Sequence, residues 1–244
     1  MSGHSKWATI KRKKAAIDAA RGQQFTRVIR ELTIAARENG SNPENNPRLR
    51  RAIDAAKASN MPADNITRAV KKGAGELEGV RYEEILYEGY APGGTAVLVE
   101  VLTDNRNRTV SEIRHMFTRR NGNLAESNAV AWMFERKGII TIEDEKMNED
   151  KLMEIALEAG AEDVQGEEGV FEIITVPAEL ETVVSALEKA GIKFESAEVQ
   201  RVAANKITIQ GSEAKSLIGL LDTLEEHDDV QKVWSNADII DEEE

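Results

Sequence analysis

Apolar residues recur at helical spacing in the first third of the chain and at strand-like spacing after it. Within residues 23–78 they form three stripes that follow the 3.6-residue period of a helix. Gly40 favours the end of the first helix, because glycine readily adopts the left-handed conformation found there. Asn46 and Pro47 suit the cap and first turn of the second helix, and Pro62 separates the second from the third. This segment is therefore predicted to be a three-helix domain.

The pattern then changes to that of a sheet. Residues 84–90 and 95–102 predict two strands of a hairpin, because the Pro-Gly-Gly between them is a turn sequence. Thr109 begins a Thr-Val-Ser-Glu capping box, which predicts the start of an amphipathic helix. The apolar run 129–134 predicts a further strand.

Residues 136–204 predict the order strand, helix, strand, strand, helix, strand, which is the ferredoxin-like order. Residues 205–240 add another strand, helix and strand, and 79–135 lacks a second helix of its own. We therefore expect an α+β protein: a basic arm (1–22), the three-helix unit, and two ferredoxin-like α+β domains. One of these combines 79–135 with 205–240, and 136–204 is inserted into it as the other.

Charge is distributed unevenly over these segments. Residues 1–81 hold 17 Lys and Arg against 8 Asp and Glu, a formal charge of +9, whereas 138–244 hold 8 against 28, a charge of −20. The net charge of −12 therefore hides a basic N-terminal module, and such a module attracts polyanions. The acidic remainder is expected to face solvent or a basic protein partner.

Other features narrow the class of protein. The chain has no cysteine, and its apolar runs fall short of the ~20 residues of a membrane span, so we expect a cytoplasmic protein without membrane contact. Its three histidines lack metal-ligand spacing, and nucleotide-binding and nucleophile-elbow motifs are missing. We expect no enzyme, catalytic residue, metal or cofactor. Acidic pairs such as Asp228 and Asp229 are interpreted as solvated surface groups.

Candidate nucleic-acid-binding residues occur in three places: the arm, the helical domain, and a Thr-Asp-Asn-Arg-Asn-Arg-Thr cluster at a predicted helix start. Cations contact phosphates and an indole can stack on a base. The alternatives are a solvated basic tail whose Trp7 packs on the helices, and a loop whose asparagines cap a helix. The candidates are Lys6, Trp7, Lys11, Arg12, Lys13, Lys14, Arg21, Arg27, Arg30, Lys71, Lys72, Arg106 and Arg108.

The stretches GHSKWATIKRKKAAIDAARG, NPRLRRAIDAAKASNMPADNITRAVKKG, YEGYAPGGTAVLVEVLTDNRNRT and AVAWMFERKG closely resemble the YebC/PmpR family of bacterial transcriptional regulators. This family includes the mitochondrial translational activator of cytochrome oxidase subunit I. The resemblance covers nearly the whole chain. Four positions depart from the family pattern GGNLGESGSVAW: Asn121, Ala125, Asn128 and Ala129.

The resemblance implies a helical domain followed by two α+β domains in a cytoplasmic regulator that binds DNA. It also implies an alternative, a ribosome-associated factor that assists translation through difficult stretches such as consecutive prolines. We therefore expect a non-enzymatic regulator of transcription that binds double-stranded DNA through its basic module. The alternative is a translation factor that binds ribosomal RNA with the arm and ribosomal protein with the acidic domains.

Overall fold

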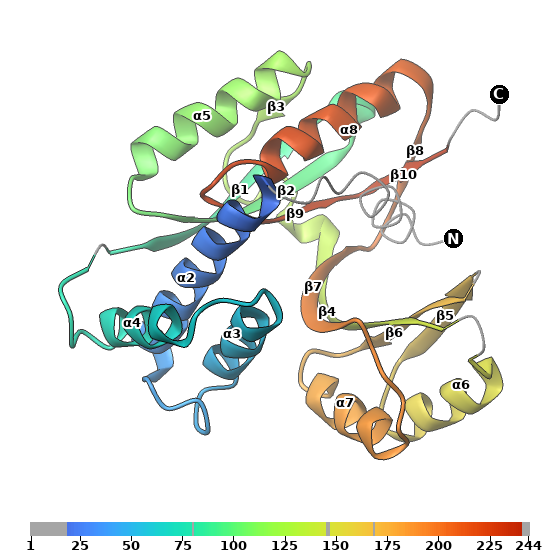
Figure 1. Cartoon of the computed structure of the whole chain (residues 1–244). Helices are drawn as coiled ribbons and strands as arrows, with labels where there is room; N and C mark the ends of the chain where they lie inside the picture. The colour runs from blue at the N-terminus through green and yellow to red at the C-terminus, as the bar shows by residue number, and fades with distance from the viewer. Residues whose placement is uncertain (1–18, 80, 145–146, 168, 241–244) are drawn as a thin grey trace. The chain divides into compact units, whose positions relative to one another are not determined.

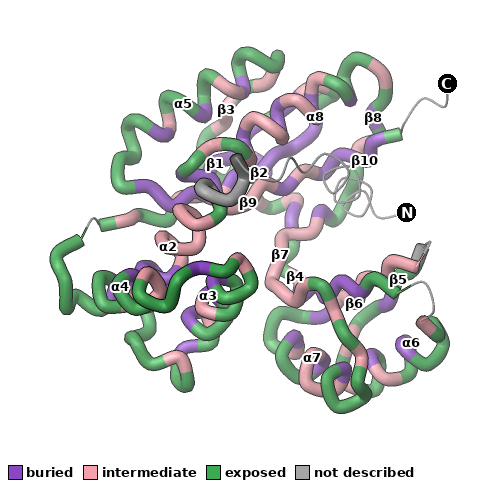
Figure 2. Tube along the Cα trace, in the orientation of Figure 1, coloured by how far each residue is buried: buried purple, intermediate pink, exposed green. Residues whose placement is uncertain are grey.

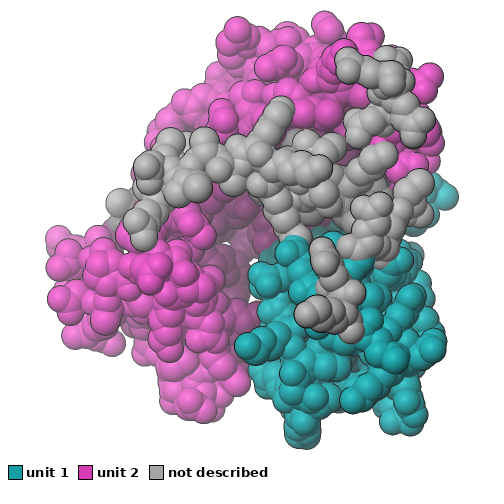
Figure 3. Space-filling model, turned by 45° about the vertical axis from the view of Figure 1, so that its right-hand side comes forward, with its two compact units in different colours: residues 1, 132–205 teal, residues 2–131, 206–244 magenta. Residues whose placement is uncertain are grey.

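The computed structural model describes residues 19–79, 81–144, 147–167 and 169–240 (Figure 1). The described chain folds into two compact units: residues 132–205 form one, and the segments before and after them form the other (Figure 3). The α+β class expected from the sequence is confirmed. None of the helices in the described ranges has the length and apolar character of a membrane span.

The helical domain consists of α2 (Ala19–Asn39), α3 (Pro47–Ala58) and α4 (Ala63–Gly73), which confirms the three predicted helices. Small and aliphatic side chains fill the space between the helices, because the helices approach closely. The close approach of α4 to α2 is clearest at Gly73, where a Cβ atom would collide with the carbonyl oxygen of Thr33 on α2. The buried core is Leu32, Ala35, Ala36, Leu49, Ala52, Ala56, Met61 and Ala69.

Asn46 holds the end of α2 against the start of α3. Its side-chain oxygen accepts the backbone N–H of Leu49 at 3.0 Å, which is the expected N-cap bond. Its amide nitrogen donates to the carbonyl oxygens of Ala35 and Gly40, both at 2.8 Å. The side chain is completely buried, so one asparagine satisfies backbone groups of two helix ends at once.

The sheet domain of the same unit is assembled from two segments of the chain. The strands are all antiparallel, in the order β3-β1-β2-β9, and β8 pairs with β10 in parallel. Helices α5 and α8 supply the apolar side chains that bury one face of this sheet (Figures 1 and 2). The elements are β1 (Glu83–Tyr90), β2 (Ala96–Thr103), α5 (Arg106–Arg119), β3 (Asn123–Leu124), β8 (Ile207–Ile209), α8 (Gly211–Glu225), β9 (Val230–Ser235) and β10 (Ala237–Ile239).

The inserted unit, 132–205, has the ferredoxin-like order and topology expected from the sequence, with an antiparallel sheet β5-β6-β4-β7. Side chains of α6 and α7 pack against one face of it around Ile140, Phe171 and Ile173. The elements are β4 (Phe134–Glu143), α6 (Glu149–Glu158), β5 (Asp163–Glu167), β6 (Val170–Thr175), α7 (Leu180–Lys189) and β7 (Ser196–Ala203).

The first sheet has the same spatial plan with a different path of the chain. A strand–helix–strand unit, β2-α5-β3, spans the intervening β1, as in a ferredoxin-like sheet. However, β1 precedes β2 in a hairpin instead of following β3. The chain leaves for the inserted unit after β3 and returns to supply β8, α8 and β9. The second helix that 79–135 lacks thus comes from the C-terminal segment.

Two local predictions were wrong. The apolar run 129–134 does not form one strand, because Ala131–Met133 is a turn of 3₁₀ helix and β4 begins only at Phe134. Thr109 does not cap α5. Asn105 is the cap, and its side chain accepts the backbone N–H of Arg108 at 3.1 Å. Thr109 lies inside the helix and is completely buried.

Candidate nucleic-acid interface

Six of the predicted contact residues, all in the arm, lie outside the described residues: Lys6, Trp7, Lys11, Arg12, Lys13 and Lys14. Arg21 belongs to the first turn of α2, and its side chain is likewise outside the described part. Their role as phosphate contacts stays a prediction. The structure does place the remaining six.

Arg30 of α2 is engaged within the chain. Its Nη1 lies 2.7 Å from Oδ1 of Asp229 and 3.3 Å from the carbonyl oxygen of Leu102, and it also donates to the carbonyl oxygen of Asp228. Its guanidinium carbon lies 5.5 Å from the ring centroid of Tyr82. Only 11% of the side chain is exposed. These contacts hold α2 on the sheet domain, so Arg30 contributes little to an outer basic surface.

Arg27 lies one turn earlier on the same side of α2. Its Nη2 donates to the carbonyl oxygen of His227 at 3.4 Å, and its Nε is buried without a hydrogen-bond partner among the described residues. Burial lowers the pKa of Arg27, although the negative charges of Glu225 and Asp228 act to raise it. Like Arg30, this arginine faces the loop between α8 and β9.

Asp229 is the last residue of that loop and the centre of a hydrogen-bond network. It is only 1% exposed, which corrects its interpretation as a solvated surface group. Its Oδ2 accepts hydrogen bonds from Thr103 at 3.0 Å, from Arg108 at 2.8 Å, and from Thr109. Burial alone would raise the pKa of this carboxyl. The hydrogen bonds from Thr109 and Arg108 and the charge of Arg30 outweigh burial and hold the pKa below its ordinary value.

The two arginines of the Thr-Asp-Asn-Arg-Asn-Arg-Thr cluster have different surroundings. Arg108 pairs with Asp229 and, at 3.0 Å, with Asp104, and the bond to Asp229 is the main cause that raises its pKa. Arg106 is exposed at the first position of α5 and has no carboxylate partner among the described residues. Only Arg106 therefore keeps its charge available from this cluster.

Glu112, His227 and Asp229 each bring one potential metal-ligand atom within 4.8 Å of the others. The backbone N–H of Asp229 donates to Nδ1 of His227 at 3.1 Å, so the ring proton lies on Nε2, which donates to Glu112 at 2.8 Å. Both oxygens of Asp229 already accept hydrogen bonds from arginines. Two guanidinium groups would repel a cation here, so the cluster fits a hydrogen-bonded network better than a metal centre.

Lys71 and Lys72 are exposed in the last turn of α4. Arg68, one turn earlier, is exposed on the same side of the helix, because residues three and four apart are neighbours on a helical surface. Within the described ranges none of the three forms an ion pair. We call Arg68, Lys71 and Lys72 the α4 basic face. It is the clearest group of unpaired cations that the structure describes in the helical domain.

A further cation of the helical domain, Arg48, is neutralised by carboxylates. Arg48 donates to Glu31 at 2.7 Å, to Glu38 at 2.8 Å and to Glu84 of β1 at 2.9 Å. The pKa of Arg48 is raised, chiefly by the hydrogen bond with Glu31, whose effect is larger than the opposite effect of burial. Arg48 and Arg30 thus both join the helical domain to the sheet domain, and the two domains lie in one compact unit.

The loop that leads to the inserted unit is held by Glu88 of β1. This buried carboxylate accepts the backbone N–H groups of Asn128 at 2.6 Å and of Val130 and Ala131 at 2.8 Å. Two of the positions that depart from the family's glycines, Asn121 and Asn128, have φ angles of +58° and +67°. Asparagine is among the few residues with a side chain that adopt this left-handed conformation readily, so the backbone path does not require glycine there.

The helical domain, the α4 basic face and the two sheet domains define the class: an α+β protein whose basic helical domain precedes two sheet domains, one inserted in the other. The chain belongs to the TACO1/YebC family. Residues 5–76 match the N-terminal domain of that family, and residues 82–237 match its second and third domains.

Relatives and a solved structure are similar over nearly the full length. Proteins named probable transcriptional regulatory protein in Desulforapulum autotrophicum and Geobacter sulfurreducens are 57% and 56% identical, over 99% and 100% of this chain and 98% of each relative. The crystal structure of a conserved hypothetical protein from Aquifex aeolicus is 52% identical with a TM-score of 0.85, over 92% of this chain and 93% of that one.

Proposed function

We propose that this chain is a transcriptional regulatory protein without enzymatic activity that contacts the phosphates of double-stranded DNA through residues 1–81. The observation that carries the proposal is the α4 basic face, whose three exposed cations have no carboxylate partner among the described residues. The regulatory names of the full-length relatives support the same class.

Electrostatics limit where such contacts can be made. Cations that are not neutralised within the protein gain most from phosphates, because each contact releases counterions from the DNA. The segment 138–244 carries a formal charge of −20 and repels a duplex within a Debye length of ~8 Å. The DNA footprint is therefore expected outside 138–244, on the unpaired cations of residues 1–81, among them the α4 basic face, with Arg106 as the candidate from α5. Phosphate contacts position a protein on the DNA backbone, so this mode of binding needs no side chains that contact the edges of the bases.

Binding of a duplex across a salt series tests this proposal. The logarithm of the affinity should fall linearly with the logarithm of salt concentration, by about 0.9 for each phosphate contacted. Replacing Arg68, Lys71 and Lys72 together by alanine should make that slope shallower by roughly 2 to 3. Replacing Lys11, Arg12, Lys13 and Lys14 together by glutamine should have a comparable effect.

The matched control removes three exposed lysines of the inserted unit, Lys151, Lys189 and Lys193. It changes the net charge equally but lies outside the proposed footprint, so its slope should equal that of the unaltered protein. Equal slopes for the control and the α4 variant would remove the α4 basic face from the interface. A full-length protein that binds no duplex at low salt would overturn the proposal.

The competing function is a translation factor, and one observation favours it: the acidic charge of 138–244 offers a surface suited to basic ribosomal proteins. In that case the protein should co-sediment with ribosomes at physiological salt, while its duplex binding is weak. DNA binding as proposed predicts the reverse. Loss of co-sedimentation after neutralising acidic residues of the inserted unit would support the translation factor specifically.

A further inference from the structure

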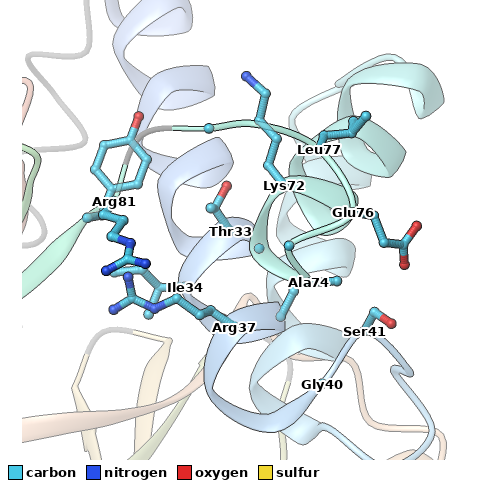
Figure 4. Close-up of a pocket in the computed structure, with 15 residues that line it drawn as sticks. Thr33, Ile34, Arg37, Gly40, Ser41, Lys72, Ala74, Glu76, Leu77 and Arg81 are labelled. Carbon is cyan, nitrogen blue, oxygen red and sulfur yellow. The ribbon is translucent and has the colours of Figure 1, made fainter.

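A groove of about 620 Å³ lies in the helical domain, where the end of α2, the end of α4 and the segment leading to β1 meet (Figure 4). Glycines and other small residues form part of its lining, among them Gly40, Ser41, Ala74 and Gly75. Small side chains leave the backbone accessible, so a ligand can approach it closely. None of the side chains that bond to the Asp229 carboxylate lines the groove.

Three cations border the groove: Arg37 at the end of α2, Lys72 at the end of α4, and Arg81 ahead of β1. All three are exposed and have no carboxylate partner in the described part of the chain. In Figure 4 the side chains of Arg37 and Arg81 point toward one another, whereas Glu76 lies on the other side of the groove. Two like charges that line one groove gain from an anion placed between them.

Helix dipoles account for only part of this arrangement. Arg37 and Lys72 lie in the last turns of their helices, where a cation offsets the partial negative charge of the terminal carbonyls. Arg81 belongs to no helix, so this explanation does not apply to it. An anion between Arg37 and Arg81 would offset their like charges, and the planar guanidinium fork matches the oxygens of a phosphate.

We propose that this groove is a binding site for one phosphate group of a nucleic-acid strand, held by Arg37 and Arg81 from two sides. The proposal rests on the function proposed above and adds a defined subsite to it. Lys72 lines the groove and is also part of the α4 basic face, so a strand that follows this face can extend into the groove. Lys72 therefore connects the subsite to the rest of the footprint.

A double-mutant cycle of Arg37→Ala and Arg81→Ala on the full chain tests whether both arginines hold the same phosphate. Each single variant should weaken duplex binding about tenfold and make the salt slope shallower by about 0.9, one phosphate. The double variant should show the same change of slope, and its loss of affinity should be smaller than the product of the two single losses. The control is Arg50→Ala on α3, which removes an exposed cation of the same domain outside the groove.

Variants that bind as tightly as the unaltered protein, or that lose no more than Arg50→Ala, would overturn the subsite while leaving the proposed function intact. A second probe keeps the subsite testable if the protein binds no nucleic acid. Inorganic pyrophosphate should raise the thermal unfolding midpoint of the unaltered protein and of Arg50→Ala, but not that of the double variant. No rise in the unaltered protein, or an equal rise in the double variant, would contradict the site.

Discussion

The guanidinium of Arg30 lies 2.7 Å from the carboxylate of Asp229, and this ion pair joins α2 to the loop between α8 and β9. The pair is buried, with 11% and 2% of the two side chains exposed. Two groups of basic residues can be distinguished in the part of the chain that the structure describes before β1. Arg27, Arg30 and Arg48 hold the domain in place, whereas the α4 basic face, Arg37 and Arg81 keep their charges available.

Replacing Asp229 by asparagine should strongly destabilise this unit. The change leaves the buried Arg30 without its counter-charge and weakens the bonds from Thr103 and Thr109. Breaking a buried ion pair by removing one partner costs about 3–5 kcal/mol. Urea unfolding of the full chain, followed by circular dichroism, should show this loss in the free energy of unfolding.

The neighbouring Asp228 provides the control for that experiment. Its side chain is exposed, and Arg30 contacts it only through the backbone carbonyl, which the substitution Asp228→Asn leaves in place. We expect a change of less than about 1 kcal/mol. Equal effects at both positions would show that the buried network has no special role in stability.

Stability should also depend on pH through Asp229. Because the folded pKa of this carboxyl lies below its ordinary value, protonation is harder in the folded state than in the unfolded state. The stability that the ionised carboxyl of Asp229 contributes is therefore complete above its unfolded pKa of about 3.9. This stability is lost as the pH falls through the folded pKa. Thermal unfolding between pH 7 and pH 3 should show a fall in midpoint at the acidic end that is smaller in Asp229→Asn. Parallel curves for the two proteins would contradict this assignment.

The left-handed conformation of Asn128 predicts opposite effects for two small substitutions. Asn128→Gly should leave stability unchanged or raise it slightly, because glycine adopts a φ of +67° without strain. Asn128→Val should lower the free energy of unfolding by about 1–2 kcal/mol. The same pair at Asn45, an exposed loop residue outside the positive-φ positions, is the control. Equal stability of the glycine and valine variants at position 128 would argue against backbone strain.

Glu88→Gln should loosen the loop at residues 128–131. An amide cannot accept at both ends as the carboxylate does, so at least one of the three backbone N–H groups faces another donor. Amide hydrogen exchange of Asn128, Val130 and Ala131 should become at least tenfold faster, while exchange in β2 stays the same. Unchanged protection of the three amides would show that Glu88 does not hold the loop.

Elements defined by local chemistry could be predicted from the sequence. Asn46 and Pro47 start α3 because a side-chain acceptor and a residue without an N–H suit that position wherever the helix packs. The ferredoxin-like order of 136–204 followed from the alternation of short strands and helices, each with its own apolar pattern. Both depend on contacts within a few residues.

Features set by distant contacts could not be predicted. Asp229 was indistinguishable from its acidic neighbours, because its burial depends on Arg30 and on Thr103 and Thr109, far away in the sequence. For the same reason Thr109 matched a capping box although it bonds Asp229 from inside the helix. Arg30 and Lys72 likewise appear equivalent as isolated cations. Only the fold separates the neutralised one from the unpaired one.

Crosslinking in cells, with sequencing of the bound nucleic acid and mapping of the crosslinked peptides, tests the central claim most directly. The account predicts that the recovered nucleic acid is DNA and that the crosslinked peptides fall within residues 1–81, including the α4 basic face. Recovery of ribosomal RNA instead of DNA would contradict the proposed role in transcription. Crosslinks confined to the acidic segment 138–244 would contradict the basic N-terminal module as the site of contact.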